Sequence, residues 1–192
     1  MSKIIKESVS EVEFKKLISH VRGDLSIKEN TKSNLIRTFT LLYYTGSRLN
    51  ELIQLLNSDI LEIFKNKELI IKTHKTKNER KIYFSDDAVK ELKKIFIDID
   101  KEESHFKIIR SKSKPYQSPH NITFIQQVNK YMKAVLGERF SSHSFRQGLI
   151  TEMATKGINT KIIKEYIGHS DIKTTLRYVK PSKVDIKNSL VR

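Results

Sequence analysis

The sequence predicts a mainly α-helical protein that carries a small three-stranded antiparallel β-sheet. Apolar residues recur at helical spacing through most of the chain, and glycines such as Gly46, Gly137 and Gly168 separate the helical runs. Residues 60–84 differ, because β-branched and aromatic residues there alternate with short turn-like segments. At 192 residues the chain is long enough to bury the core of one compact domain.

The first helices are predicted from their end signals. Ser10 and Glu13 have the spacing of a capping box and precede an apolar run, which predicts a helix over 10–22. After a polar link, apolar residues at helical spacing predict a second helix that ends at Gly46. A short helix is expected to follow almost at once, in the stretch "RLNELIQLL".

The three segments "ILEIF", "ELIIKT" and "RKIYF" are predicted to form the sheet, over about residues 60–84. Ser85 then caps the helix "DDAVKELKKIF", and "SKSKPYQSPH" is a loop with two prolines. The rest of the chain is predicted to be helical, over 119–136, 142–156, 159–167 and 171–179.

The charge of the chain indicates a polyanionic partner. Lysine and arginine number 37 against 22 acidic residues, which leaves a net charge of +15. Such a domain is drawn to nucleic acid because neutralised phosphates release counterions. A lysine-rich surface without function and an acidic membrane are the other readings. No apolar run reaches membrane-spanning length, no signal peptide is recognisable, and the absence of cysteine excludes disulfides and thiolate metal sites. We expect nucleic acid as the partner, no membrane association, and a cytoplasmic, nucleoid-associated protein.

Three short motifs carry basic side chains that are suited to anion binding or catalysis. In "YYTGSRLNEL", Arg48 follows a glycine turn and begins a helix with an apolar face. The arginine is either a surface charge or a buried cation held for an anion, and Glu51 is a candidate partner for it. In "HSFRQG", His143 and Arg146 are three residues apart and share a helix face. That pair is favoured where an anion lies between the two side chains, although an ordinary first-turn histidine and an exposed arginine would look the same.

The stretch "IGHSDIKTTLRY" places His169 after a glycine and ends in Tyr178, whose neighbours are largely polar. Arginine and histidine suit a phosphodiester, an anion whose pentacovalent transition state gains further charge. A phenol, with an ordinary pKa of about 10, attacks phosphorus if a histidine takes its proton. A lysine from the turn "THKTKNER" is then available to protonate the leaving oxygen.

Taken in order, these blocks resemble the catalytic domain of the tyrosine recombinase (phage integrase) family. "TGSRLNEL", "HKTKNERKIYF", "HSFRQG" and "IGHSDIKTTLRY" match the family's boxes over about residues 33–180. The resemblance implies the catalytic residues Arg48, Lys75, His143, Arg146, His169 and Tyr178, with Lys77 as the alternative lysine. Gln147 and Ile167 depart from residues common in the family, but neither change removes a catalytic group.

The resemblance implies site-specific recombination. Tyr178 would attack the scissile phosphate and form a 3′-phosphotyrosyl link, while Arg48, Arg146 and His169 hold the non-bridging oxygens. His143 would assist removal of the Tyr178 proton, and Lys75 would protonate the 5′-oxygen. Because the covalent intermediate conserves the phosphodiester energy, neither ATP nor a metal cofactor is required. The alternatives are relaxation of DNA by a type IB topoisomerase and a DNA-binding domain with an idle remnant site.

The resemblance also sets expectations for organisation. Residues 1–180 are expected to form the catalytic domain, and residues 181–192 a tail that a neighbouring protomer exchanges within a homo-tetramer on paired DNA sites. Family members usually carry an N-terminal core-binding domain. Only 47 residues precede Arg48, so we expect that domain to be absent from this sequence.

Overall fold

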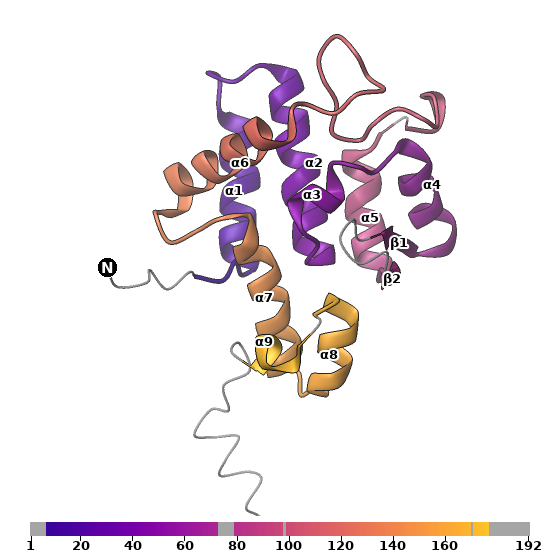
Figure 1. Ribbon diagram of the computed structural model, residues 1–192. Coiled ribbons are helices and arrows are strands. Elements are labelled where there is room, and N and C mark those ends of the chain that lie inside the picture. The colour runs from indigo at the N-terminus through magenta and orange to yellow at the C-terminus, as the bar shows by residue number, and fades with distance from the viewer. Residues whose placement is uncertain (1–6, 73–78, 98, 170, 177–192) are drawn as a thin grey trace, which may run out of the picture.

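A computed structural model describes residues 7–72, 79–97, 99–169 and 171–176. Within these ranges the fold is mainly helical with one small antiparallel hairpin (Figure 1). The elements are α1 (Glu11–Gly23), α2 (Glu29–Thr45), α3 (Leu49–Leu52), α4 (Asn57–Asn66), β1 (Glu68–Lys72), β2 (Glu79–Tyr83), α5 (Asp86–Ile95), a 3-10 turn (Ile99–Lys101), α6 (Asn121–Leu136), α7 (Ser142–Thr155), α8 (Thr160–Ile167) and α9 (Ile172–Leu176). No helix in the described ranges is long and apolar enough to cross a bilayer.

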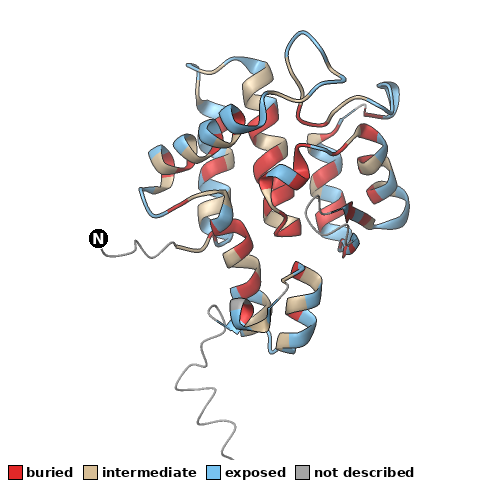
Figure 2. Cartoon of the chain, viewed as in Figure 1, coloured by how far each residue is buried: buried red, intermediate tan, exposed pale blue. Residues whose placement is uncertain are grey.

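Helix α2 is the centre of the fold and contacts α1, α3, α5 and α7. Its residues Leu35, Phe39 and Leu42 recur at helical spacing and are fully buried, and residues 38–42 are buried without a break, so the helix lies within the core, as Figure 2 shows along α2 and α3. The predicted stop at Gly46 is confirmed. Gly46 adopts a left-handed conformation with φ of 56°, and its N–H donates to the carbonyl of Leu42 at 3.0 Å.

Two helix starts that were predicted from capping residues are also confirmed. The Ser10–Glu13 capping box is present at the start of α1, and the Ser85 hydroxyl accepts from the N–H of Ala88 at the start of α5. The helix predicted in "RLNELIQLL" is shorter than expected, because α3 contains only Leu49–Leu52.

The prediction of a third strand is wrong for the segment 60–64, which lies inside helix α4. Asp59 accepts from the N–H of Leu56 at 2.8 Å and so caps this helix, and Ile60 and Ile63 are both buried on one helical face. Four apolar residues within a five-residue segment are compatible with either period, and packing onto the core decides for the helix. The described residues form a two-stranded sheet in which Glu68 pairs with Tyr83 and Lys72 with Glu79.

The apolar interior is divided into two clusters. The larger one contains most of the buried residues of α1–α6, and Phe145 of α7 stacks on Phe39 within it at 5.9 Å between ring centroids. The smaller one joins α7 to α8 through Ile150, Ile163 and Ile167. Helix α7 therefore bridges the main body and the α8–α9 unit, which extends from it in Figure 1.

The chain segment before α1 lies against α7. The N–H of Val9 donates to the carbonyl of Ser144 at 3.0 Å, and an added Cβ at Gly148 would lie 2.0 Å from the carbonyl oxygen of Val9. Only a residue without a side chain permits this approach. Gly148 thus fixes how closely residues 7–10 lie against the helix that carries His143 and Arg146.

We expect Gly148→Ala to destabilise the fold by about 1–3 kcal/mol, because the new methyl group displaces the Val9 backbone. Gly23→Ala is the matched control, since an added Cβ at this helix-end glycine meets nothing within 4 Å. The control should stay within about 0.5 kcal/mol of wild type. Urea denaturation followed by circular dichroism measures both changes, and equal stabilities of the two variants would contradict this account of residues 7–10.

Candidate active site

Arg48 lies at the turn between α2 and α3. Its backbone N–H donates to Oε2 of Glu51 at 2.8 Å, and its Nη1 donates to Oε1 of the same carboxylate at 3.0 Å. Glu51 is therefore the partner suggested by the sequence. The Arg48 side chain remains 40% exposed, so it is neither an isolated surface charge nor a fully buried cation.

The same carboxylate also binds Arg80, a residue that the sequence analysis missed. Nη2 of Arg80 donates to Oε2 of Glu51 at 2.9 Å and to Oγ of Ser47 at 3.0 Å, while Nη1 donates to the carbonyl of Tyr166 at 3.1 Å. The side chains of Glu51 and Arg80 are each only 6% exposed. Burial by itself raises the pKa of Glu51, but the N–H of Arg48 and the charge of Arg80 outweigh it and lower that pKa.

One sequence signal pointed toward this pair. Arg80 occupies an inward position of β2, two residues before the buried Ile82. An inward-facing arginine in a strand requires a partner in the interior.

Arg146 lies on α7 and is 1% exposed, which excludes the exposed-arginine reading of "HSFRQG". Its Nη1 donates to the carbonyl of Gly46 at 3.0 Å and its Nη2 to the carbonyl of Ile167 at 2.5 Å. These carbonyls belong to the C-terminal ends of α2 and α8, where backbone oxygens are left without helical partners and carry partial negative charge. The buried cation is stabilised by two helix ends.

His169 follows α8 and lies against Arg146. Nε of Arg146 donates to Nε2 of His169 at 3.3 Å, and Nδ1 of His169 lies 2.9 Å from the hydroxyl of Thr175. An imidazole that accepts at Nε2 is neutral and carries its proton on Nδ1, which then donates to Thr175. Burial, followed by the charges of Arg146 and Arg48, lowers the pKa of His169 to about 4, so the neutral form prevails near pH 7.

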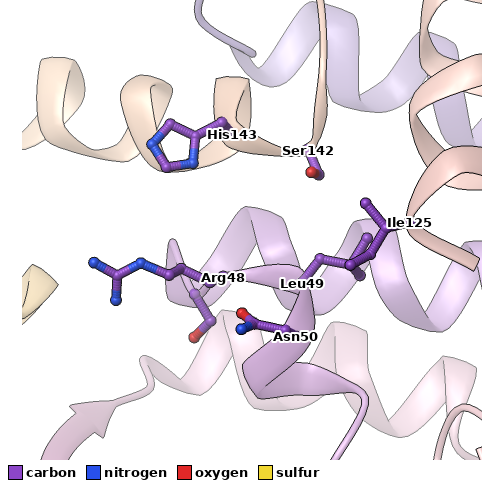
Figure 3. Close-up of a pocket in the computed structure, with 7 residues that line it drawn as sticks. Arg48, Leu49, Asn50, Ile125, Ser142 and His143 are labelled. Carbon is purple, nitrogen blue, oxygen red and sulfur yellow. The ribbon is translucent and has the colours of Figure 1, made fainter. Parts of the chain in front are cut away.

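His143 is the second residue of α7 and faces Arg48 across a pocket of about 220 Å³. In Figure 3 the side chains of Arg48 and His143 extend in the same direction from two facing elements. Desolvation, reinforced by the charges of Arg146 and Arg48, lowers the pKa of His143. The pocket is lined by Ser47, Arg48, Leu49, Asn50, Ile125, Ser142 and His143.

Four of the six predicted site residues therefore gather around one place: Arg48, His143, Arg146 and His169. Lys75 and its alternative Lys77 fall between β1 and β2 and lie outside the described residues, as does Tyr178. No group of three or more histidine, aspartate or glutamate side chains suited to a metal occurs among the described residues. Arg48 and His143 line the pocket, and the linked pair of Arg146 and His169 lies next to them, an arrangement that suits an anion beside a proton acceptor.

The comparisons with known proteins show the family of the chain. A model of the phage integrase family matches residues 7–184, and the chain belongs to this family. Tyrosine recombinase XerA of Pyrococcus horikoshii is 28% identical over 190 residues, which cover 98% of this chain and 61% of that protein. TnP I resolvase of Bacillus thuringiensis is 25% identical over 192 residues, which cover 95% of this chain and 60% of that protein. The chain thus spans about three-fifths of the length of these relatives.

Solved structures show the same fold. A crystal structure of XerA recombinase has a TM-score of 0.70 at 19% identity and covers 98% of this chain and 64% of that one. The catalytic domain of bacteriophage HP1 integrase has a TM-score of 0.57 at 16% identity and covers 96% of this chain and 95% of that one. The expected fold, that of tyrosine recombinase catalytic domains, is confirmed in its mainly helical architecture with a small hairpin.

The lowered pKa of His169 predicts a stability change with pH. As pH falls, the unfolded histidine takes up a proton near its ordinary pKa of 6.5, whereas the folded one does so at about 4. Its contribution to stability is present above pH 6.5 and is lost as the pH falls toward 4. Urea denaturation at about pH 7 and about pH 5 should show a smaller loss of unfolding free energy in His169→Gln than in wild type. His105→Gln, at an exposed site, should follow the wild-type curve; an unchanged loss in His169→Gln would contradict the assignment.

Proposed function

We propose that this chain is the catalytic part of a tyrosine recombinase that cuts and rejoins double-stranded DNA at specific sites. The convergence of Arg48, His143, Arg146 and His169 supports this most directly, because these side chains come from three separate segments, Arg48 and His143 line one pocket, and Arg146 contacts His169 beside them. Membership of the phage integrase family supports it independently. The names of the curated relatives, recombinases and a resolvase, favour recombination over DNA relaxation by a topoisomerase.

In the proposed reaction, the phenol oxygen of Tyr178 attacks the scissile phosphorus and the bond to the 5′-oxygen breaks. The phenol proton passes to His143, which the lowered pKa keeps neutral and ready to accept it. Lys75 gives a proton to the departing 5′-oxygen. Arg48 and Arg146 stabilise the charge on the non-bridging oxygens, and His169, held beside Arg146, orients that guanidinium and completes the anion site.

The reverse attack by a 5′-hydroxyl of a second strand releases the tyrosine and joins the new partners. Exchange between two sites requires several copies, and we propose a homo-tetramer on paired DNA, with residues 181–192 contacting a neighbouring protomer. XerH site-specific recombinase has been solved bound to its difH substrate, and the Tn1549 transposon integrase with circular intermediate DNA; both share this fold, at TM-scores of 0.71 and 0.69. DNA in the cytoplasm, as host chromosome or mobile element, is the proposed substrate.

Replacing the nucleophile tests the reaction. Tyr178→Phe keeps the ring and removes the attacking oxygen, so covalent capture of DNA should fall below detection while DNA affinity stays near the wild-type value. The measurement uses a nicked duplex from the locus that encodes the chain, with denaturing electrophoresis for the adduct and anisotropy for binding. Tyr116→Phe, at an exposed loop position, is the matched control and should form adduct normally. Capture by Tyr178→Phe, or no capture by wild type, would reject the proposal.

The identity of the acid can be tested with a better leaving group. Lys75→Ala should slow cleavage of an ordinary duplex by roughly 10²–10⁴-fold, the usual size of a general-acid contribution. A duplex with sulfur at the 5′-bridging position should be cleaved nearly normally by the same variant, because a thiolate leaves without protonation. Lys77→Ala is the control. If the sulfur duplex rescues Lys77→Ala and leaves Lys75→Ala slow, Lys77 is the acid.

A further inference from the structure

The Glu51 carboxylate lies between two arginines that differ in exposure. Arg48 is 40% exposed and lines the pocket, whereas Arg80 is 6% exposed and does not line it. Both guanidinium groups carry a positive charge. The three side chains together carry one net positive charge.

Arg80 is fixed in place by more than the carboxylate. Its guanidinium also donates to Ser47 and to the carbonyl of Tyr166, and an added Cβ at Gly168 would lie 3.0 Å from its Cδ. Arg80 is thus held between the turn before α3 and the end of α8, and it is not placed to reach an anion in the pocket. Arg48, with its exposed guanidinium, is the member that can.

A carboxylate beside one arginine alone would largely cancel that arginine's charge. With ion pairs of 3.0 Å to Arg48 and 2.9 Å to Arg80, Glu51 is neutralised by the buried cation while it still orients the exposed one. We infer that Arg80 is a positioning residue for the proposed reaction: it balances Glu51, so that Arg48 is held in place by the carboxylate and keeps its full charge for the phosphate.

The placement of Arg80 adds a second consequence. Arg80 is the second residue of β2, the strand that follows the segment containing Lys75, and it binds the carbonyl of Tyr166 three residues before His169. The same guanidinium therefore ties the hairpin to Arg48 through Glu51 and to the His169 turn through α8. This inference rests on the proposed function, but its anion-binding part can be tested without DNA.

The test measures the affinity of the full chain for inorganic phosphate, from NMR shifts of the His143 and His169 imidazoles at about pH 7.5. Arg80→Met leaves Glu51 paired with Arg48 alone, so phosphate affinity should fall on the order of tenfold, the effect of one unit charge near the anion in a partly screened site. Arg80→Met combined with Glu51→Gln removes both members of the buried pair and should return the affinity to within about threefold of wild type, since Arg48 regains its charge.

Arg110→Met is the matched control, because Arg110 forms an arginine–glutamate pair with Glu102 away from the pocket and should bind phosphate as wild type does. A double variant as weak as Arg80→Met would overturn the inference, since loss of packing and not of charge would then explain the defect. If Arg80→Met does not fold, Arg80→Lys decides: near-normal affinity supports charge balance, and a tenfold loss overturns it. Failure of wild type to capture DNA covalently would reject the proposed function while leaving the phosphate result intact.

Discussion

The buried guanidinium of Arg146 is the constraint around which the site is built. A cation that is 1% exposed requires oriented acceptors, because water no longer solvates it. Its hydrogen bonds to the carbonyls of Gly46 and Ile167 and to His169 join α7 to the ends of α2 and α8. Each of those helices must therefore end where a carbonyl can face Arg146, and the left-handed turns at Gly46 and Gly168, with φ of 56° and 72°, make those ends possible.

At the C-terminal end of α8, the last four backbone carbonyls all accept hydrogen bonds. The last four carbonyls of a helix have no helical donor. Here the carbonyl of Lys164 accepts from the N–H groups of Gly168 and His169, and the carbonyl of Glu165 also accepts from Gly168. The carbonyl of Tyr166 accepts from Arg80, and the carbonyl of Ile167 accepts from Arg146. Two arginines thus complete a helix end that would otherwise expose unpaired oxygens in a partly buried place, and the same contacts hold His169 beside the pocket.

Local signals predicted most of the fold. Capping at Ser10 and Ser85 and the glycine stop at Gly46 act within a few residues, so the sequence reveals them directly. The segment 60–64 was assigned to a strand because its four apolar residues fit either period, and only the packing of α4 on the core distinguishes the two. The motif residues of the site were found for the same local reason. Arg80 was missed because its partner Glu51 is 29 residues away, and its burial is a property of the tertiary structure.

The arginines of this site have different roles, which follow from how exposed each side chain is. Arg80 and Arg146 are buried and satisfy helix ends and a carboxylate, whereas Arg48 keeps an exposed guanidinium beside the pocket. An anion site made only of exposed arginines would lose side-chain entropy when it bound phosphate, and water would screen its charge. A buried cationic frame avoids both effects, because its side chains are already ordered and its field reaches the pocket through a medium of low dielectric constant. Desolvation, together with the charges of Arg146 and Arg48, lowers the pKa values of His143 and His169, so one arrangement prepares both the anion site and the proton acceptor.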